Sequence, residues 1–409
     1  MKKRQFFLEI LFVSLFFTLV ACGGGGGETT ETPINRTIEP KKINVGLLFD
    51  AKRPESPSIA TNGPRIVVAW SDKNIVGRHN IYLARSTDGG ASFSPPENLS
   101  KNEDVEDDSG VIIITKPVVI MNDSNVLVAW SYFTEKQGGT RTFITRSTDG
   151  GVSFSTPVNF FPGFNSLGEL SMAFNDTDVV IAWHQLTSIL VTDIYLARSS
   201  DNGVSFSTPV NISNGSRNAK NPSVAISGSN ILVAWSQETS SSELVLLSTR
   251  STNSGVNFST PVILDGSSLP DLKPLVVMNG SDVLVVWGKK LSSSSGNNEV
   301  NLLRSIDGGI SFSPSVNLSK DRFANNHSIA INDSNIVIAW AALMESENRI
   351  FITRSTDSGI NFSPTVNFFK RFENSTNPSV AISGTDALIV WRETLRFTLQ
   401  DTIFFARID

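Results

Sequence analysis

The sequence predicts an all-β fold, a seven-bladed β-propeller built from four-stranded antiparallel blades. Three observations predict it: seven evenly spaced tryptophans, four short β-branched runs in each repeat, and one turn sequence that occurs six times. The chain has 409 residues, of which 40% are hydrophobic and 18% are charged. This composition is typical of globular protein, and the length suffices for one large domain.

The tryptophans mark the repeat. They are separated by 51 to 60 residues, and the chain contains no others. Binding residues usually differ from one repeat to the next, so an aromatic residue present in every repeat predicts core packing rather than sugar stacking. The seven are Trp70, Trp130, Trp183, Trp235, Trp287, Trp340 and Trp391.

Each repeat contains four candidate strands. In the fourth repeat they are residues 222–227, 230–235, 244–250 and 257–264, each rich in Val, Ile or Leu and bounded by Gly, Asn, Ser or Pro. Such runs are typical of β-strands. Four strands in about 52 residues are typical of a propeller blade, which covers its faces by packing against its neighbours.

The two ends of the repeat region complete each other. The seventh repeat ends after its third strand, and INVGLLFD at 43–50 resembles the missing fourth strand. We therefore expect residues 43–49 to pair with 402–407 and close the ring. Ring closure would remove exposed strand edges that promote aggregation.

The N-terminal segment has the pattern of a secretory signal peptide. A basic start, MKKRQ, precedes an apolar run and LVAC, which resembles the lipobox of bacterial lipoproteins. The resemblance implies a signal peptide at 1–21 and a lipid on Cys22, the only cysteine. GGGGG and polar residues follow, so we expect 22–42 to be a flexible tether and 43–409 the propeller. The apolar run is too short for a membrane-spanning helix.

The repeated turn sequence reads RSTDGGASFSPP at 85–96 and recurs between the third and fourth strands. One glycine never varies, which predicts a left-handed backbone there. The acidic position is occupied by an acceptor of turn amides in every copy, and asparagine replaces aspartate once. A position that tolerates asparagine needs an acceptor rather than a catalytic acid or metal ligand. The residues are Asp88, Asp149, Asp201, Asn253, Asp307 and Asp357.

This turn sequence resembles the Asp box of bacterial sialidases and related propellers. The six copies, at blade spacing, cover the region 43–409. The resemblance implies that the Asp boxes are structural and lie on the face opposite the ligand site. Asp boxes also occur in propellers without sialidase activity, so the resemblance supports the fold more directly than an activity.

Sialidase chemistry would need a tyrosine nucleophile assisted by a glutamate, and arginines for the substrate carboxylate. The chain has three tyrosines, and Tyr82 and Tyr195 occupy third-strand positions where other repeats carry Phe or Leu. If the protein is an enzyme, the candidates are Tyr132, Glu135, Glu238 and Arg392. The arginine that ends each third strand lies at the Asp-box end and is expected to bond turn carboxylates or carbonyls.

The opposite face is where the repeats differ, so we expect the ligand site there. The residues that precede the first strands are Ser56, Lys116, Glu169, Asn221, Lys273, Asn326 and Asn377. Together with residues that follow the tryptophans they form a mixed polar ring. The candidate ligand-binding residues are Lys116, Glu169, His184, Lys273, Arg392 and Glu393.

No metal or cofactor is predicted with a defined ligand set. His184 and His327 are isolated, and the one cysteine is assigned to the lipid. The insertion KNEDVEDDSG could offer oxygen ligands to calcium at Glu103, Asp104, Asp107 and Asp108. It lacks the pattern of a calcium loop, so a solvated acidic loop is favoured.

The hypothesis from sequence is a lipid-tethered, monomeric binding or scaffold propeller at the bacterial outer membrane or cell surface. It would bind a glycan or protein and touch the membrane only through its lipid. The formal net charge of −5 argues against nucleic acid as a partner. The alternative is a sialidase-like glycoside hydrolase.

Overall fold

The computed structural model describes residues 41–42, 53–73, 79–100, 112–114, 116–134, 139–160, 166–188, 191–213, 218–241, 243–266, 273–290, 298–320, 324–344, 346–368, 374–395 and 400–408. All of them belong to one compact unit, 37–409. Within these ranges every regular element is a strand, and none is a helix that could cross a bilayer. The predicted signal peptide, Cys22 and the four candidate calcium ligands lie outside the described residues.

The strands form seven sheets, one for each repeat. Blades 1 to 3 comprise β2 Arg53–Asn62, β3 Arg65–Lys73, β4 His79–Ser86 and β5 Glu97–Asn98; β6 Ile112–Ile114, β7 Val118–Asn122, β8 Asn125–Thr134, β9 Gly139–Ser147 and β10 Val158–Phe160; and β11 Ser166–Asn175, β12 Asp178–Ser188, β13 Val191–Ser199 and β14 Val210–Asn211. Blades 4 and 5 comprise β15 Lys220–Ser227, β16 Asn230–Glu238, β17 Leu244–Ser251 and β18 Val262–Asp265; and β19 Leu275–Asn279, β20 Asp282–Lys290, β21 Asn298–Ser305 and β22 Val316–Asn317.

Blades 6 and 7 complete the set. They comprise β23 Ala324–Asn332, β24 Asn335–Met344, β25 Glu347–Ser355 and β26 Val366–Phe368; and β27 Ser375–Ser383, β28 Asp386–Leu395, β29 Gln400–Ile408 and β1 Lys41–Lys42. The sheets are antiparallel with four strands, except that the first strand of blade 2 is split into β6 and β7. The predicted fold class, an all-β seven-bladed propeller, is confirmed.

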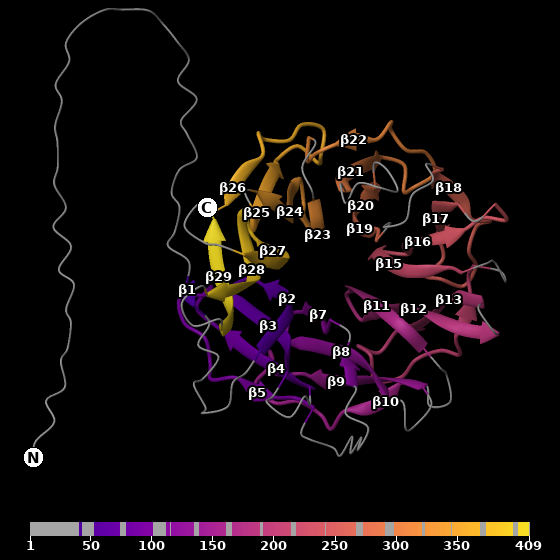
Figure 1. Ribbon diagram of the computed structural model, residues 1–409. Coiled ribbons are helices and arrows are strands. Elements are labelled where there is room, and N and C mark those ends of the chain that lie inside the picture. The colour runs from indigo at the N-terminus through magenta and orange to yellow at the C-terminus, as the bar shows by residue number, and fades with distance from the viewer. Residues whose placement is uncertain are drawn as a thin grey trace, which may run out of the picture. The chain divides into compact units, whose positions relative to one another are not determined.

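The first strands line the axis of the propeller. Figure 1 shows β2, β7, β11, β15, β19, β23 and β27 innermost, with the later strands of each blade placed progressively outward. Each first strand contacts the first strand of the next blade, and β27 contacts β2, so the ring is closed. Any residue at the start of a first strand therefore lies close to the axis.

The core lies between the blades, as the tryptophan spacing predicts. The tryptophans are at most 5% exposed, and each belongs to an apolar cluster. Trp70 stacks on Tyr82 and Trp183 on Tyr195, with ring centroids 6.2 Å apart in both pairs. These two tyrosines are thus packing residues of the third strands, as expected from sequence.

The ring closes through the last blade. Lys41 and Lys42 of β1 pair antiparallel with Phe405 and Phe404 of β29, which supplies the outer strand that the seventh repeat lacks. The closing strand therefore begins two residues before the predicted range and includes residues assigned to the tether. Residues 43–49 lie outside the described residues.

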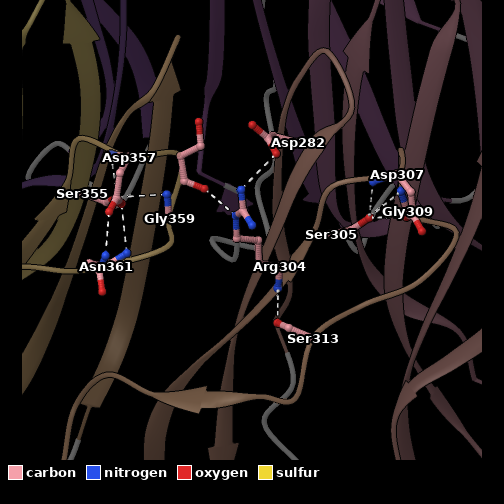
Figure 2. A network of polar contacts seen from close by, with 11 residues as sticks. Asp282, Arg304, Ser305, Asp307, Gly309, Ser313, Ser355, Asp357, Gly359 and Asn361 are labelled. Atoms are coloured by element: carbon pink, nitrogen blue, oxygen red, sulfur yellow. Dashed lines mark hydrogen bonds and ion pairs between the residues drawn. The ribbon is translucent and has the colours of Figure 1, made fainter.

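The Asp boxes form one repeated hydrogen-bond network, which Figure 2 shows for blades 5 and 6. Ser305 Oγ donates to Asp307 Oδ1 over 2.7 Å and accepts from the Gly309 amide over 2.9 Å. Asp307 in turn accepts from the amide and the hydroxyl of Ser311. These bonds, first of all the one from the Ser311 hydroxyl, lower the pKa of Asp307.

Two features of the structure favour glycine at the invariant position of the Asp box. Its φ lies between +76° and +87° in all six copies, a left-handed conformation that disfavours a side chain. The glycine also meets the preceding blade: a Cβ on Gly309 would lie 2.2 Å from Leu232 Cδ1, and one on Gly203 would lie 2.3 Å from Leu127 Cδ2. The Asp box is therefore an inter-blade contact as well as a turn.

Arginines that end the third strands also link neighbouring blades. Arg304 reaches from blade 5 to the Ser358 carbonyl in the Asp box of blade 6, with Nε 2.6 Å from the oxygen, and pairs with Asp282 (Figure 2). Arg198 makes the same kind of bond to the Ser254 carbonyl over 2.7 Å. These contacts agree with the structural role expected for this series of arginines.

Candidate functional site

The candidate site begins with an irregularity in the first strands. In blades 1, 3, 4, 6 and 7 the pairing between first and second strands shifts register near the start of the first strand. Such a β-bulge re-aims the side chains beside it. In blade 2 the strand is interrupted between β6 and β7, and in blade 5 it begins only at Leu275.

The irregularity sits at the seven positions that the sequence marks before the first strands. Four of them have a left-handed backbone, with φ between +48° and +55°: Ser56, Asn221, Asn326 and Asn377. Asparagine tolerates this conformation better than other residues with side chains. The repeat thus presents a small polar side chain at the axis in four blades, and a longer charged one in the other three.

The seven positions line one cavity of about 830 Å³ at the propeller axis, to which all seven blades contribute. The cavity lies at the end of the blades opposite the Asp boxes. Glu55 at the start of β2 pairs with Ser71 at the end of β3, and Ser71 pairs with Ile81 near the start of β4. The Asp box follows the other end of β4, so each blade separates the two features by its full length.

Three charged residues meet in this cavity. Lys273 of blade 5 forms an ion pair with Glu169 of blade 3, which bridges the intervening blade 4. Lys116 of blade 2 lies in the same cavity. Its side chain is exposed within the cavity, but the protein atoms that surround it desolvate the ammonium group and lower its pKa to about 8. Glu169 opposes the shift and Lys273 adds to it.

The cavity extends sideways between blades 5 and 6. Gly288 and Ala341, which follow Trp287 and Trp340, are small enough to leave this space open. Three amides line the extension: Asn298, Asn325 and Asn348. Asn298 Nδ2 donates to Asn325 Oδ1 over 3.1 Å.

Sequence reasoning missed this side pocket. The small residues after the two tryptophans were its only signal, and the amides come from three different strands. His327, expected to be structural, also borders the cavity, with its Nε2 2.7 Å from the Lys273 carbonyl oxygen.

The candidate ligand residues thus fall into two groups. Lys116, Glu169 and Lys273 meet at the cavity, whereas His184, Arg392 and Glu393 are not among its lining residues. His184 is 6% exposed within β12. Glu393 is 2% exposed, and its Oε2 accepts hydrogen bonds from Ser375 Oγ and Trp391 Nε1. These bonds tie Glu393 to the blade core.

The three candidate catalytic residues that the structure describes, Tyr132, Glu238 and Arg392, do not line the cavity. Tyr132 is 9% exposed in the core of blades 1 and 2, where its ring stacks on Phe143 with centroids 5.2 Å apart. Glu238 accepts from Asn218 Nδ2 over 2.7 Å, and Arg392 pairs with Asp401 over 2.9 Å. Glu135 lies outside the described residues.

The described residues contain no group of three or more His, Cys, Asp or Glu side chains that could hold a metal ion. The polar side chains of the lining are two lysines, one carboxylate, one histidine, amides and hydroxyls, and aliphatic side chains such as Val119, Leu170 and Met172 line the rest. The site can bind a polar ligand through ionic and hydrogen bonds.

Comparison with solved structures places the fold among known propellers. A protein of unknown function from Dyadobacter fermentans is 14% identical with a TM-score of 0.56, and the match covers 91% of this chain and 98% of that one. A polysaccharide lyase of family PL25, an ulvan lyase, is 12% identical with a TM-score of 0.55, covering 87% and 94%. The intramolecular trans-sialidase of Ruminococcus gnavus, solved with oseltamivir carboxylate, is 11% identical with a TM-score of 0.50, covering 90% and 98%.

Identities this low show a shared fold, and the activities in those descriptions belong to the proteins named. No curated protein matches the sequence significantly. The sequence itself matches the family described as BNR repeat-like domain over residues 64–273, just over half of the chain. Six Asp boxes at blade spacing and seven sheets around a closed ring agree with that match. The chain therefore belongs to the family of BNR repeat-like domains, and its fold is a sialidase-like β-propeller.

Proposed function

We propose that this protein is a binding module that holds a glycan in the axial cavity on the face opposite the Asp boxes. The observation that carries the proposal is that all seven blades contribute polar or charged side chains to this one cavity. In five blades the cavity residue lies within a register shift of the first strand, and in the other two it lies just before that strand's main segment begins. A concave site with several convergent polar groups is a typical small-ligand site.

Two features favour binding over hydrolysis. The only tyrosine outside the third strands, Tyr132, is packed in the core. The carboxylate in the cavity, Glu169, is already paired with Lys273. A sialidase-like hydrolase would need a nucleophile within reach of the anomeric carbon, and the described cavity lining includes no tyrosine.

A glycan array with a blocking variant tests the proposal. Lys273→Trp places a bulky ring in the cavity, while Val152→Trp changes an exposed residue next to the Asp box of blade 2. We expect the wild type and Val152→Trp to bind the same glycans and Lys273→Trp to lose them. Equal binding by both variants would contradict the axial site. Turnover of a fluorogenic sialoside that Tyr132→Phe abolishes would favour the hydrolase.

We also propose that Cys22 anchors the propeller to the bacterial outer membrane or cell surface. The lipobox-like LVAC and the following glycines support this. Expressed in a bacterial host, the wild type should be recovered in the membrane fraction and Cys22→Ala in the soluble fraction. Recovery of both in the same fraction would argue against a lipid on Cys22.

A further inference from the structure

The axial cavity contains more positive than negative charge. Two ammonium groups, Lys116 and Lys273, share a single carboxylate, Glu169. The chain as a whole has a formal net charge of −5, so this cluster is opposite in sign to the molecule around it. Low-dielectric walls focus the field of such a cluster into the cavity. The cavity therefore attracts an anion although the protein as a whole does not.

The existing ion pair is easy to exchange. The side chains of Lys273 and Glu169 are 52% and 44% exposed, and ion pairs this exposed contribute little to stability. Replacing Glu169 by another anion on Lys273 would therefore cost the protein little. Glu169 would then be free to turn toward Lys116, whose charge its carboxylate already stabilises.

The remaining lining suits the hydroxyls of a sugar. Amides of Asn298, Asn325 and Asn348 line the side pocket between blades 5 and 6, and Lys273 precedes the first strand of blade 5. The described lining contains no Trp, Tyr or Phe, so recognition would depend on ionic and hydrogen bonds rather than on ring stacking. It contains no arginine either. Lysine acts as a point charge and does not require a planar, bidentate acceptor, so both carboxylates and sulfate esters fit.

From these observations we propose that the cavity binds an acidic saccharide by counter-ion exchange, in which the ligand's carboxylate or sulfate ester displaces Glu169 from Lys273. This inference rests on the proposed function and specifies its ligand class. Lys116 and Lys273 hold the anionic group, the side-pocket amides hold hydroxyls, and Glu169 is the internal competitor. Glu169 therefore sets the affinity of the cavity for anions.

Calorimetric titration of the full chain tests the exchange. The probes are tetragalacturonate, a sulfated galactose tetrasaccharide, a neutral galactose tetrasaccharide and a glutamate-rich peptide. We expect at least one charged saccharide to bind 10-fold or more tightly than the neutral one, and its affinity to fall as salt is raised. The two charged saccharides distinguish carboxylate from sulfate ester as the preferred group.

Variants separate the roles of the residues. Lys273→Met should lower the affinity for the charged saccharide at least 10-fold. Glu169→Gln should raise that affinity about three- to ten-fold and leave the affinity for the neutral saccharide unchanged. Lys289→Met is the matched control, because Lys289 is also ion-paired, with Asp265 over 3.6 Å, but does not line the cavity. Its affinity should equal that of the wild type.

The outcomes are distinguishable from failure of the proposed function. If no saccharide binds, in this titration or on the array, the binding proposal itself fails. If the neutral probe binds as tightly as the charged ones, or if Glu169→Gln weakens the charged probe, the cavity is a glycan site but the exchange is wrong. Tighter binding of the peptide than of any saccharide would overturn the ligand class.

Discussion

The Asp-box end and the axial end of the blades both contain residues with a left-handed backbone, but the two ends differ in the residue types found there. At the Asp-box end, two consecutive positions have a left-handed backbone: the first is glycine, asparagine or serine, and the second is glycine in all six copies. At the axial end, the left-handed position is occupied by serine or asparagine in four blades, and the other three blades carry lysine or glutamate at the equivalent position. The difference is packing: a Cβ on the invariant Asp-box glycine would meet the preceding blade, whereas the axial position faces the cavity.

This comparison shows where the repeat tolerates change. The Asp-box glycine is invariant because it has the same left-handed conformation in every copy and packs closely beneath the turn. Residues that face the cavity are constrained only to be compatible with the bulge, so they can differ and form a site. The following predictions test this contrast by changing equivalent features at the two ends.

The largest effect is expected at the Asp-box glycine. Gly309→Ala introduces strain at φ +83° and a Cβ 2.2 Å from the fully buried Leu232 side chain, so we expect a loss of about 3 kcal/mol in unfolding free energy. Gly228→Ala is the control: its φ is +55° and the added Cβ meets nothing within 4 Å, so about 1 kcal/mol is expected. Equal losses of unfolding free energy in the two variants, measured by denaturant unfolding, would show that the inter-blade contact does not contribute to stability.

The serine that begins the Asp box comes next. Ser305 is 2% exposed, and Ser305→Ala leaves the Gly309 amide without its acceptor, which should cost about 1–2 kcal/mol. Ser315→Ala, at an exposed residue in the following segment, should change stability by less than about 0.5 kcal/mol. A thermal or denaturant midpoint shared by both variants would argue against the network.

The Asp-box carboxylates should make stability depend on acid. The pKa of Asp357 is lowered to about 2, chiefly by the hydrogen bond from the backbone N–H of Asn361. Because the folded pKa lies below the unfolded value, this stabilisation is present above about pH 4 and is lost as the pH falls toward 2. The Asp357→Asn variant lacks this contribution. Its denaturation midpoint should therefore be lower than that of the wild type at pH 7, and the two should converge near pH 2.

The Asp box of blade 4 already has asparagine, Asn253, at the position that Asp357→Asn changes. Asn253 keeps the bonds from Ser251 Oγ, over 2.9 Å, and from the Asn257 amide, over 3.0 Å, without a charge. The fold of Asp357→Asn should therefore be intact, with an unchanged circular dichroism spectrum. A folded variant whose stability has the same pH dependence as the wild type would contradict the assignment of that dependence to Asp357.

Lys116, at the axial end, should destabilise the folded protein at neutral pH, whereas Asp357 stabilises it. The pKa of Lys116 is lowered from 10.5 to about 8, so folding disfavours its charge. The cost is fully present below about pH 8 and is relieved as the pH rises from about 8 to 10.5, where the unfolded state binds more protons. Because the side chain reaches water, Lys116→Met should raise stability at pH 7 by less than about 1 kcal/mol. A decrease, measured by denaturation, would show that Lys116 is stabilising.

The smallest effect is expected at the axial left-handed position. Asn377 has φ +53°, which glycine adopts without strain, so Asn377→Gly should change the unfolding free energy by no more than a few tenths of a kcal/mol. The outcome mirrors the loss predicted for Gly309→Ala. A loss above about 1 kcal/mol would show that the Asn377 side chain supports the fold rather than the cavity.

Much of the architecture could be predicted from the sequence because it repeats. Trp70 and its six counterparts are buried as their periodicity indicates, and Asn253 shows why the acidic position needs only an acceptor. The seven residues that precede the first strands were identified by their place in the repeat, and all of them line the cavity. The position of the closing strand was predicted less well, since a two-residue strand at 41–42 has no periodicity of its own.

Contacts between distant repeats could not be predicted in this way. No sequence pattern links Glu169 to Lys273, which are 104 residues apart and come from blades that are not neighbours. Glu393 is a candidate ligand residue that follows a tryptophan, as His184 and Arg392 do, yet it bonds to Trp391 and Ser375 in the core. The direction of each such side chain depends on local bulges and on the space that the next blade leaves.

The sequence by itself determined the number of blades, the buried tryptophans and the structural role of the Asp boxes. These features follow from local periodicity and turn chemistry, which seven repeats reinforce. Only the tertiary structure decided which polar residues meet, that two lysines share one carboxylate at the axis, and that a side pocket opens between blades 5 and 6. Such convergence depends on closing the ring, which brings residues from all seven repeats within reach of one another.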